Sequence, residues 1–230
     1  MTDTPTAQTD WHAIHAARAA RLEREERMNC LTHALGALAG VVGMVYLLTV
    51  TAQRGDGWQM LACAIYASAL VAVFVASALS HAFHQSRWRR LFRMIDQACI
   101  FLLIAGTFTP IATTYLRQGA WWILLAAMWA VALVGFASKA FFAHRVESVS
   151  TKLHLVLGWM PVLAAKPIIL LAPAGLGVWM LAGGCCYSLG TIWLHNDHRP
   201  YFHVVWHLLV IAGSACHFLA IWAYCTIAPL

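Results

Sequence analysis

Charged side chains are scarce in this sequence. They make up 10% of its 230 residues, whereas a soluble globular domain carries roughly 25%. A soluble domain of this size covers its surface with polar groups, and this chain has too few of them. The scarcity excludes an ordinary soluble enzyme and a disordered protein. The net charge of +6 does not indicate a nucleic-acid partner, because the basic residues are spread between apolar runs instead of gathering on one face or tail.

Two further features are missing. No two of the seven cysteines have the CxxC spacing typical of metal and redox sites, so we interpret them as small buried hydrophobic residues. The polar stretch that ends at Arg27 has neither an early apolar core nor a small-residue cleavage site, so we expect no signal peptide. The first hydrophobic segment is then expected to serve as the targeting signal as well.

Long apolar runs dominate instead, and hydrophobic residues make up 61% of the chain. A membrane helix needs about 20 mostly apolar residues, whereas strands of a membrane barrel are shorter and alternate. Seven segments qualify as helical spans: Cys30–Val50, Trp58–Ser80, Asp96–Tyr115, Ala120–Phe141, Leu153–Ala172, Leu176–Leu194 and Tyr201–Cys225. The sequence therefore predicts an all-α polytopic membrane protein, a bundle of seven transmembrane helices. Residues 1–27 are predicted to form a cytoplasmic leader and residues 28–230 the transmembrane domain.

Basic residues predict the orientation of the bundle. Twelve of the 15 Lys and Arg residues fall on one predicted side: Arg18, Arg21, Arg24, Arg27, Arg87, Arg89, Arg90, Arg93, Lys139, Arg145, Lys152 and Arg199. The three others are Arg54, Arg117 and Lys166. Because cytoplasmic loops carry the excess of Lys and Arg, we expect a cytoplasmic N-terminus and a C-terminus outside.

Acidic residues are few, and almost all of them fall in predicted tails and loops. Asp96 is the exception, because it starts the third predicted span. An acidic residue in a membrane span is costly and indicates a functional site by default. The alternative is a helix N-cap at the interface, a position that Asp also favours.

Histidines cluster at the same predicted depth as Asp96. His81 closes the second span four residues after Ser77, so the two share one helix face. His203 and His207 open the seventh span at the i, i+4 spacing that can place two imidazoles on one metal. Three imidazoles and a water form the ligand set of a catalytic zinc. Ordinary interfacial histidines are the alternative, since helix ends often carry them.

His217 and His154 also lie in predicted spans but differ from these. His217 follows His207 by ten residues, about 15 Å farther along a helix, and is predicted to be a packed, hydrogen-bonded core residue. His154 begins the fifth span and is interpreted as interfacial.

Several motifs together resemble the bacterial haemolysin III family, within the wider progestin and adiponectin receptor family. They occur in the family's order from residue 26 nearly to the end of the chain. The motifs are Glu26-Arg-Met-Asn29-Cys-Leu-Thr32-His33-Ala-Leu-Gly36, Ser77-Ala-Leu-Ser-His81, Asp96 with Ile104-Ala-Gly-Thr-Phe-Thr-Pro110, Gly158-Trp159, and Phe202-His-Val-Val-Trp-His-Leu-Leu-Val210 with Gly213-Ser214 and His217-Phe218.

The resemblance implies a multi-pass location in the inner (plasma) membrane of a bacterium and a zinc ion held by His81, His203 and His207. It also implies that Asp96 holds the zinc-bound water, with Ser77 beside it. Asn29, Thr32 and His33 match the first-span motif without an assigned chemical step, and a capping or packing role fits them equally well.

Three functions remain open at this stage. A zinc-dependent hydrolase of lipid amides or esters, similar to ceramidases, would use Asp96 and Ser77 as catalytic groups and contribute to membrane-lipid homeostasis. A receptor-like regulator of lipid composition would use zinc structurally. A haemolysin-like pore is the third, although a conducting path needs polar residues along the full depth of several spans. In each case the expected partners are the lipid bilayer and a membrane lipid as substrate or ligand, and no nucleic acid.

Overall fold

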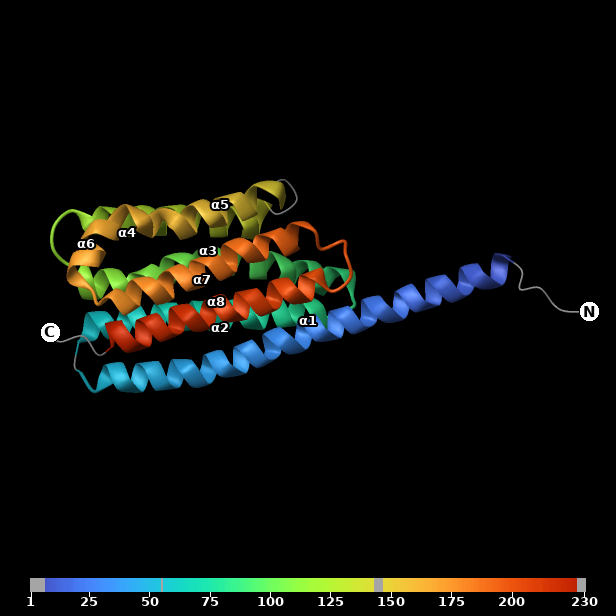
Figure 1. Ribbon diagram of the computed structural model, residues 1–230, viewed down its shortest axis with the longest axis horizontal. Coiled ribbons are helices and arrows are strands. Elements are labelled where there is room, and N and C mark those ends of the chain that lie inside the picture. Colours follow the sequence, from blue (N-terminus) through green and yellow to red (C-terminus); the bar gives the residue numbers. More distant parts are fainter. Residues whose placement is uncertain (1–6, 55, 143–146, 227–230) are drawn as a thin grey trace, which may run out of the picture.

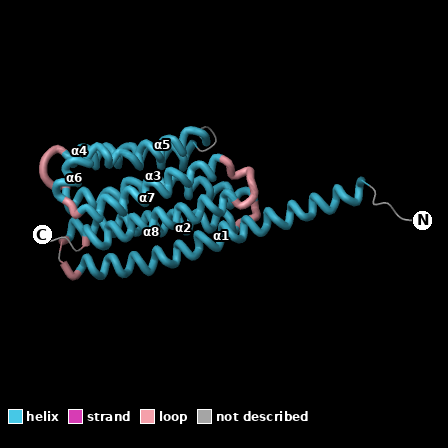
Figure 2. Tube along the Cα trace, in the orientation of Figure 1, coloured by secondary structure: helices cyan, strands magenta, loops and turns pink. Residues whose placement is uncertain are grey.

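A computed structural model describes residues 7–54, 56–142 and 147–226 of the chain. Within these ranges every element is helical (Figure 2). The elements are α1 (Ala7–Ala52), α2 (Gly57–Ala82), α3 (Ser86–Tyr115), α4 (Trp121–Phe142), α5 (Glu147–Trp159), the 3-10 helix η2 (Met160–Ala164), α6 (Ala165–Leu171), α7 (Ala174–His195) and α8 (Phe202–Cys225). Seven helical segments of the described part are long and apolar enough to cross a membrane, when α5, η2 and α6 are taken as one. The predicted seven-span bundle is confirmed.

The helices form a bundle of nearly parallel rods (Figure 1). Each span is helical because a helix satisfies its own backbone hydrogen bonds, as a chain in lipid must. The spans in α2 and α3 are the most deeply buried. Helix α2 packs against α1 and α3, α3 also packs against α4, and α8 packs against α7 and α1. We call the end of the bundle where α2 finishes and where α3 and α8 begin the histidine end.

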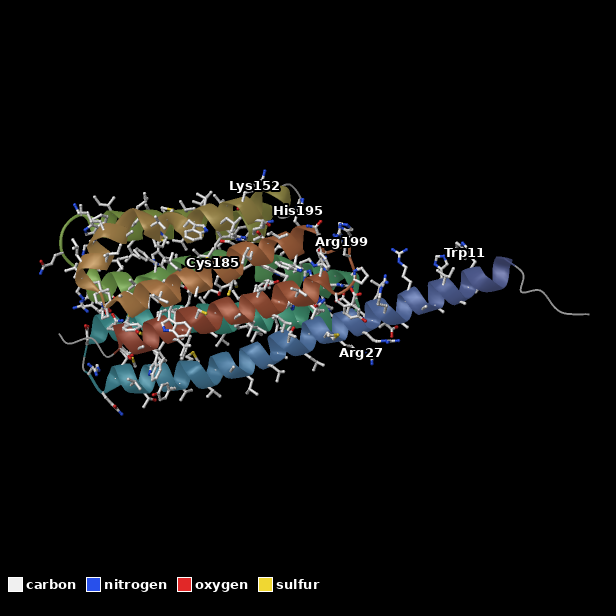
Figure 3. The ribbon with its side chains drawn as sticks, viewed as in Figure 1. Trp11, Arg27, Lys152, Cys185, His195 and Arg199 are labelled. Atoms are coloured by element: carbon white, nitrogen blue, oxygen red, sulfur yellow. The ribbon has the colours of Figure 1, made fainter. Side chains whose placement is uncertain are left out.

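Helix α1 is much longer than one membrane span. It runs without interruption from Ala7 to Ala52, through the predicted boundary between leader and first span at Met28. Its first part extends past the histidine end, and Trp11 lies well beyond the other helices (Figures 1 and 3). The predicted leader is therefore helical from Ala7 onward, and residues 1–6 lie outside the described part.

Helix α3 begins ten residues earlier than the sequence predicts. Its first residue is Ser86 and its N-cap is Gln85, so Asp96 lies nearly three turns inside the helix. The alternative interpretation of Asp96 as an N-cap is therefore wrong. The basic residues that precede Asp96 belong to the extended first turns of α3 and not to a loop.

Lys139 falls within the fourth predicted span, and the structure shows that its side chain is buried. It lies in the last turn of α4, and only 1% of the residue is exposed. Its Nζ donates a hydrogen bond to Gln97 Oε1 on α3 at 2.9 Å. The ammonium is tolerated there because polar partners meet it inside the bundle.

The fifth span is not one continuous α-helix, although the sequence predicts a single run. Helix α5 ends at Trp159, η2 follows, and α6 resumes at Ala165. Pro161 stands in the first turn of η2. Proline has no backbone N–H and clashes with the preceding turn, which accounts for the interruption.

Candidate metal centre

Three histidines from two helices converge at the histidine end. One ring nitrogen from each of His81, His203 and His207 lies within 4.8 Å of the others. The ring centroids are 5.2 Å apart for His81 and His203, 5.0 Å for His81 and His207, and 4.7 Å for His203 and His207. His81 comes from the last turn of α2, and the other two come from the first turns of α8. The structure thus brings together the three residues that the sequence predicts as ligands.

The ring of His81 contacts a carboxylate through Nδ1. Its Nδ1 lies 2.7 Å from Oε2 of Glu26 on α1. The other carboxylate oxygen of Glu26 accepts a hydrogen bond from the guanidinium of Arg89 on α3. Because Nδ1 faces this carboxylate, Nε2 is the nitrogen of His81 that is left to bind a metal.

The Nδ1 atoms of the other two rings also face oxygen atoms, at different distances. The Nδ1 of His207 lies 3.2 Å from the backbone carbonyl oxygen of Asn29 on α1. The Nδ1 of His203 lies 3.7 Å from a carboxylate oxygen of Asp197 in the turn before α8, which is beyond hydrogen-bonding distance. Metal-bound histidines commonly donate their second ring N–H to a carboxylate or a carbonyl, and in two of the three rings Nδ1 lies within hydrogen-bonding distance of such an oxygen.

Residues of α1 pack against His207 of this cluster. The ring of His33 stacks on that of His207, and it meets the ring of Phe74 edge-on at 5.1 Å. The Oγ1 of Thr32 lies 3.4 Å from Nδ1 of His207. Asn29 and His33 are buried, with 4% and 3% of each residue exposed. The first-span motif therefore packs against a candidate ligand, which identifies the packing role that the sequence left open.

Asp96 and Ser77 face each other across α2 and α3. The hydroxyl of Ser77 is within hydrogen-bonding reach of the Asp96 carboxylate. Ser77 is almost fully buried, and Asp96 is half-buried. Both residues line the same cavity as the three histidines. A carboxylate and a hydroxyl therefore lie in the wall next to the candidate metal centre.

The cavity has a volume of about 500 Å³, which is within the range of small-molecule binding sites. Its polar end is formed by the histidine cluster together with Glu26 and Asp96. From there it reaches His217, about 15 Å farther along α8. Many of the lining residues are apolar: Val73, Ile100, Leu103, Ile104, Phe108, Leu155, Trp159, Met180, Trp206 and Val210. Polar side chains of Thr107, Thr151, His154, Tyr187, Ser188 and Thr191 line the cavity as well.

His217 and His154 stay outside the cluster, although both line the cavity. The Nε2 of His217 lies 3.2 Å from the carbonyl oxygen of Met180 on α7, so the prediction of a hydrogen-bonded core histidine is confirmed. His154 packs against Phe101 with the ring centroids 4.0 Å apart. His154 therefore faces the bundle interior toward α3, and its interfacial depth stays a prediction.

Glu26 is the residue at the site that our sequence reasoning missed. We counted it with the acidic residues of the tail, because it precedes the first apolar run. The available signal was its place in the first-span motif, three residues before Asn29 and seven before His33. Positions three, four and seven residues apart share one face of a helix.

The donor set fits a zinc ion. Zinc takes imidazole nitrogens in structural and catalytic sites, and three of them leave one position of a tetrahedron open. One nitrogen from each ring lies within 4.8 Å of the other two, so the three can face a common ion. The engaged Nδ1 atoms of His81 and His207 leave their Nε2 lone pairs for the ion.

Comparisons with known proteins agree with the motifs and the fold. A family model described as "Haemolysin-III related" matches residues 22–218. Hemolysin-3 homolog of Bacillus subtilis is 33% identical, over 81% of this chain and 87% of the relative. Hemolysin-3 of Bacillus cereus is 34% identical, over 79% of this chain and 83% of the relative.

A human protein is similar as well. Monocyte to macrophage differentiation factor is 27% identical, over 74% of this chain and 72% of that protein. The family model covers most of the chain, and the bacterial relatives exceed 30% identity over most of their own length. This multi-pass membrane protein therefore belongs to the haemolysin III family, within the wider progestin and adiponectin receptor family.

Proposed function

We propose that this protein is a zinc-dependent hydrolase of a membrane lipid, acting on an amide or an ester. The observation that carries the proposal is the position of the three-histidine cluster, which lies beside Asp96 at the polar end of a largely apolar cavity. Polar groups converging at one end of a deep apolar pocket are typical of a site that orients an amphipathic molecule.

The residues around the cluster have distinct chemical roles in this proposal. A bound zinc supplies a Lewis acid that polarises a carbonyl and acidifies water. The Asp96 carboxylate accepts the proton of the attacking water, as a general base must. The hydroxyl of Ser77 donates a hydrogen bond to Asp96 and so holds this carboxylate toward the cavity. During turnover the same hydroxyl can donate to the developing oxyanion instead.

The shape of the cavity supports a lipid as the substrate. An acyl chain fits the apolar length between the levels of His207 and His217, because both residues line the cavity. The scissile amide or ester then lies at the polar end, beside the histidines. The distribution of Lys and Arg predicts that this end faces the cytoplasm. The proposed substrate therefore belongs to the cytoplasmic leaflet of the plasma membrane.

A regulatory protein with a structural zinc is the second candidate. The regulatory function is supported by the position of the candidate ligands on two helices, α2 and α8, which are separated in the chain by more than 100 residues. A metal there ties the two helices together without any reaction. This reading assigns no proton transfer to Asp96.

Turnover of labelled lipids by purified, zinc-loaded protein in nanodiscs tests the proposal. We expect release of the acyl chain from an N-acyl amino alcohol or from an ester analogue, and its loss after a chelator strips the metal. Restoring zinc should restore the release. Full zinc occupancy with no release from any lipid would favour the regulatory protein, and ion flux through liposomes would favour the haemolysin-like pore.

A further inference from the structure

Glu26 is the only carboxylate of the described part that lies within hydrogen-bonding distance of a ring nitrogen in the cluster. Its Oε2 is 2.7 Å from Nδ1 of His81, a contact between helices whose residues are 55 positions apart in the chain. The side chain of His81 is 5% exposed and that of Glu26 is 27% exposed. The contact is therefore largely shielded from water, where a hydrogen bond to a charged group is strong.

The second oxygen of Glu26 is also engaged. Its Oε1 accepts from the Arg89 guanidinium, so a different helix holds each side of the carboxylate. Two partners on α2 and α3 leave the Glu26 side chain little rotational freedom. The position of the carboxylate is then set by the packing of three helices.

We infer that Glu26 is a positioning residue, which fixes the ring of His81 so that Nε2 faces the metal. The carboxylate accepts the Nδ1–H of His81 and thereby selects one tautomer of the imidazole. Arg89 holds the carboxylate in place from the other side. The inference rests on the metal site in the proposed function, but it does not require the hydrolytic reaction.

The three rings differ in how firmly they are held. His207 is held by a neutral carbonyl of Asn29 at 3.2 Å, and His203 lies 3.7 Å from Asp197. Only His81 has an ionic acceptor at a short distance. Removing that acceptor should therefore weaken metal binding more than a similar change at Asp197.

Zinc affinity, measured by competition with a chelator in the full-length protein, tests the inference. Loss of an outer hydrogen-bond partner typically weakens metal binding about 10–100-fold, and we expect this for Glu26→Ala. Glu26→Gln keeps an acceptor oxygen and should recover part of the affinity. The matched control is Glu23→Ala on the same helix, where the side chain is 68% exposed and pairs with the exposed Arg27. This control should bind zinc as the wild type does.

A purely structural role would give a different pattern. If Glu26 only ties α1 to α3 through Arg89, Arg89→Gln should weaken zinc binding as much as Glu26→Ala does. We expect a smaller loss for Arg89→Gln, because the contact between Glu26 and His81 remains. Equal losses in the two variants would overturn the inference.

Nitrogen NMR of metal-free protein with labelled histidine gives a readout that is independent of activity. We expect His81 to carry its proton at Nδ1 in the wild type and in Glu23→Ala, and to lose this preference in Glu26→Ala and in part in Glu26→Gln. An unchanged His81 tautomer in Glu26→Ala would contradict the inference even if the wild type bound no zinc. Zinc binding without lipid turnover would refute the proposed function and leave the role of Glu26 standing.

Discussion

The imidazole of His33 lies flat against that of His207, with the ring centroids 3.6 Å apart and the ring planes 15° from parallel. His33 belongs to α1, which contributes no residue to the three-histidine cluster. Yet α1 supplies this stacking partner, the Asn29 carbonyl that faces His207 Nδ1 and the Glu26 carboxylate that faces His81. The first span therefore shapes the site from outside the ligand set.

The three histidines should be separable from the other histidines by metal content. We expect about one zinc per chain in the wild type, and a loss well beyond 100-fold in zinc affinity when His81, His203 or His207 is replaced by Ala, because each supplies a direct ligand. His217→Ala is the control, since its ring faces the Met180 carbonyl. Elemental analysis of purified protein measures the zinc content, and competition with a chelator measures the affinity. Equal zinc loss in the control would refute the ligand assignment.

Asp96→Asn should separate proton transfer from structure. Asn keeps the shape and the hydrogen-bonding capacity of Asp but cannot accept the proton. We expect lipid turnover to fall at least about 100-fold, while zinc content and thermal stability stay close to those of the wild type. Turnover at the wild-type rate would remove Asp96 from the mechanism.

The orientation of the bundle can be checked with topology reporters. Lys152, His195 and Arg199 lie at the histidine end, and Arg27 lies where α1 passes that end (Figure 3). The excess of positive charge predicts that this end is cytoplasmic. A reporter inserted near Arg90 should thus report the cytoplasm, and one fused after Leu230 should report the outside. The reverse result would move the proposed active site to the other leaflet.

Gly183 and Gly184 are neighbours on α7, but they should respond oppositely to alanine. A Cβ at Gly183 would lie 2.3 Å from the ring of His217 and 3.0 Å from the carbonyl oxygen of Gly213 on α8, whereas one at Gly184 would meet only Trp159 at 3.7 Å. We expect Gly183→Ala to destabilise the protein by about 1–3 kcal/mol. Gly184→Ala should be neutral, or stabilising by up to about 1 kcal/mol, through its helix propensity. Thermal unfolding in detergent compares the two variants.

Asp56 should give the stability a dependence on acid pH. It caps α2 by accepting from the backbone N–H groups of Trp58 and Gln59, and it pairs with Arg117. Partial burial raises the pKa of Asp56, but the hydrogen bonds from Arg117 and from the two N–H groups outweigh this and hold the pKa below its ordinary value of 3.8. The ionised group therefore stabilises the fold above about pH 4, and this stabilisation is lost as the pH falls through the lowered pKa.

The variant Asp56→Asn tests that dependence, because Asn still caps a helix but cannot form the ion pair. At pH 7 we expect a loss of up to about 1 kcal/mol, as for an exposed ion pair. The difference from the wild type should shrink toward zero as the pH falls below 3. A difference that stays constant with pH would show that the carboxylate charge does not contribute.

The sequence by itself determined the number of spans and predicted a common level for His81, His203 and His207, whereas their convergence depends on how α2 and α8 pack. Length and hydropathy suffice for a membrane helix, and the i, i+4 spacing with a common depth suffices to bring the histidine-bearing helix ends to one level. The proposed roles of these residues in binding zinc, like the orientation, remain predictions.

Only the tertiary structure decided what surrounds those histidines. Core-facing and lipid-facing residues of a membrane helix are both apolar, so the sequence does not show which face of α1 meets α2 and α8. That contact places Glu26 beside His81, and His33 on His207. The burial of Lys139 and the interior position of Asp96 on α3 likewise depend on helix packing and on where α3 begins. Hydropathy does not show where α3 begins, because a helix can continue past the apolar run into polar sequence.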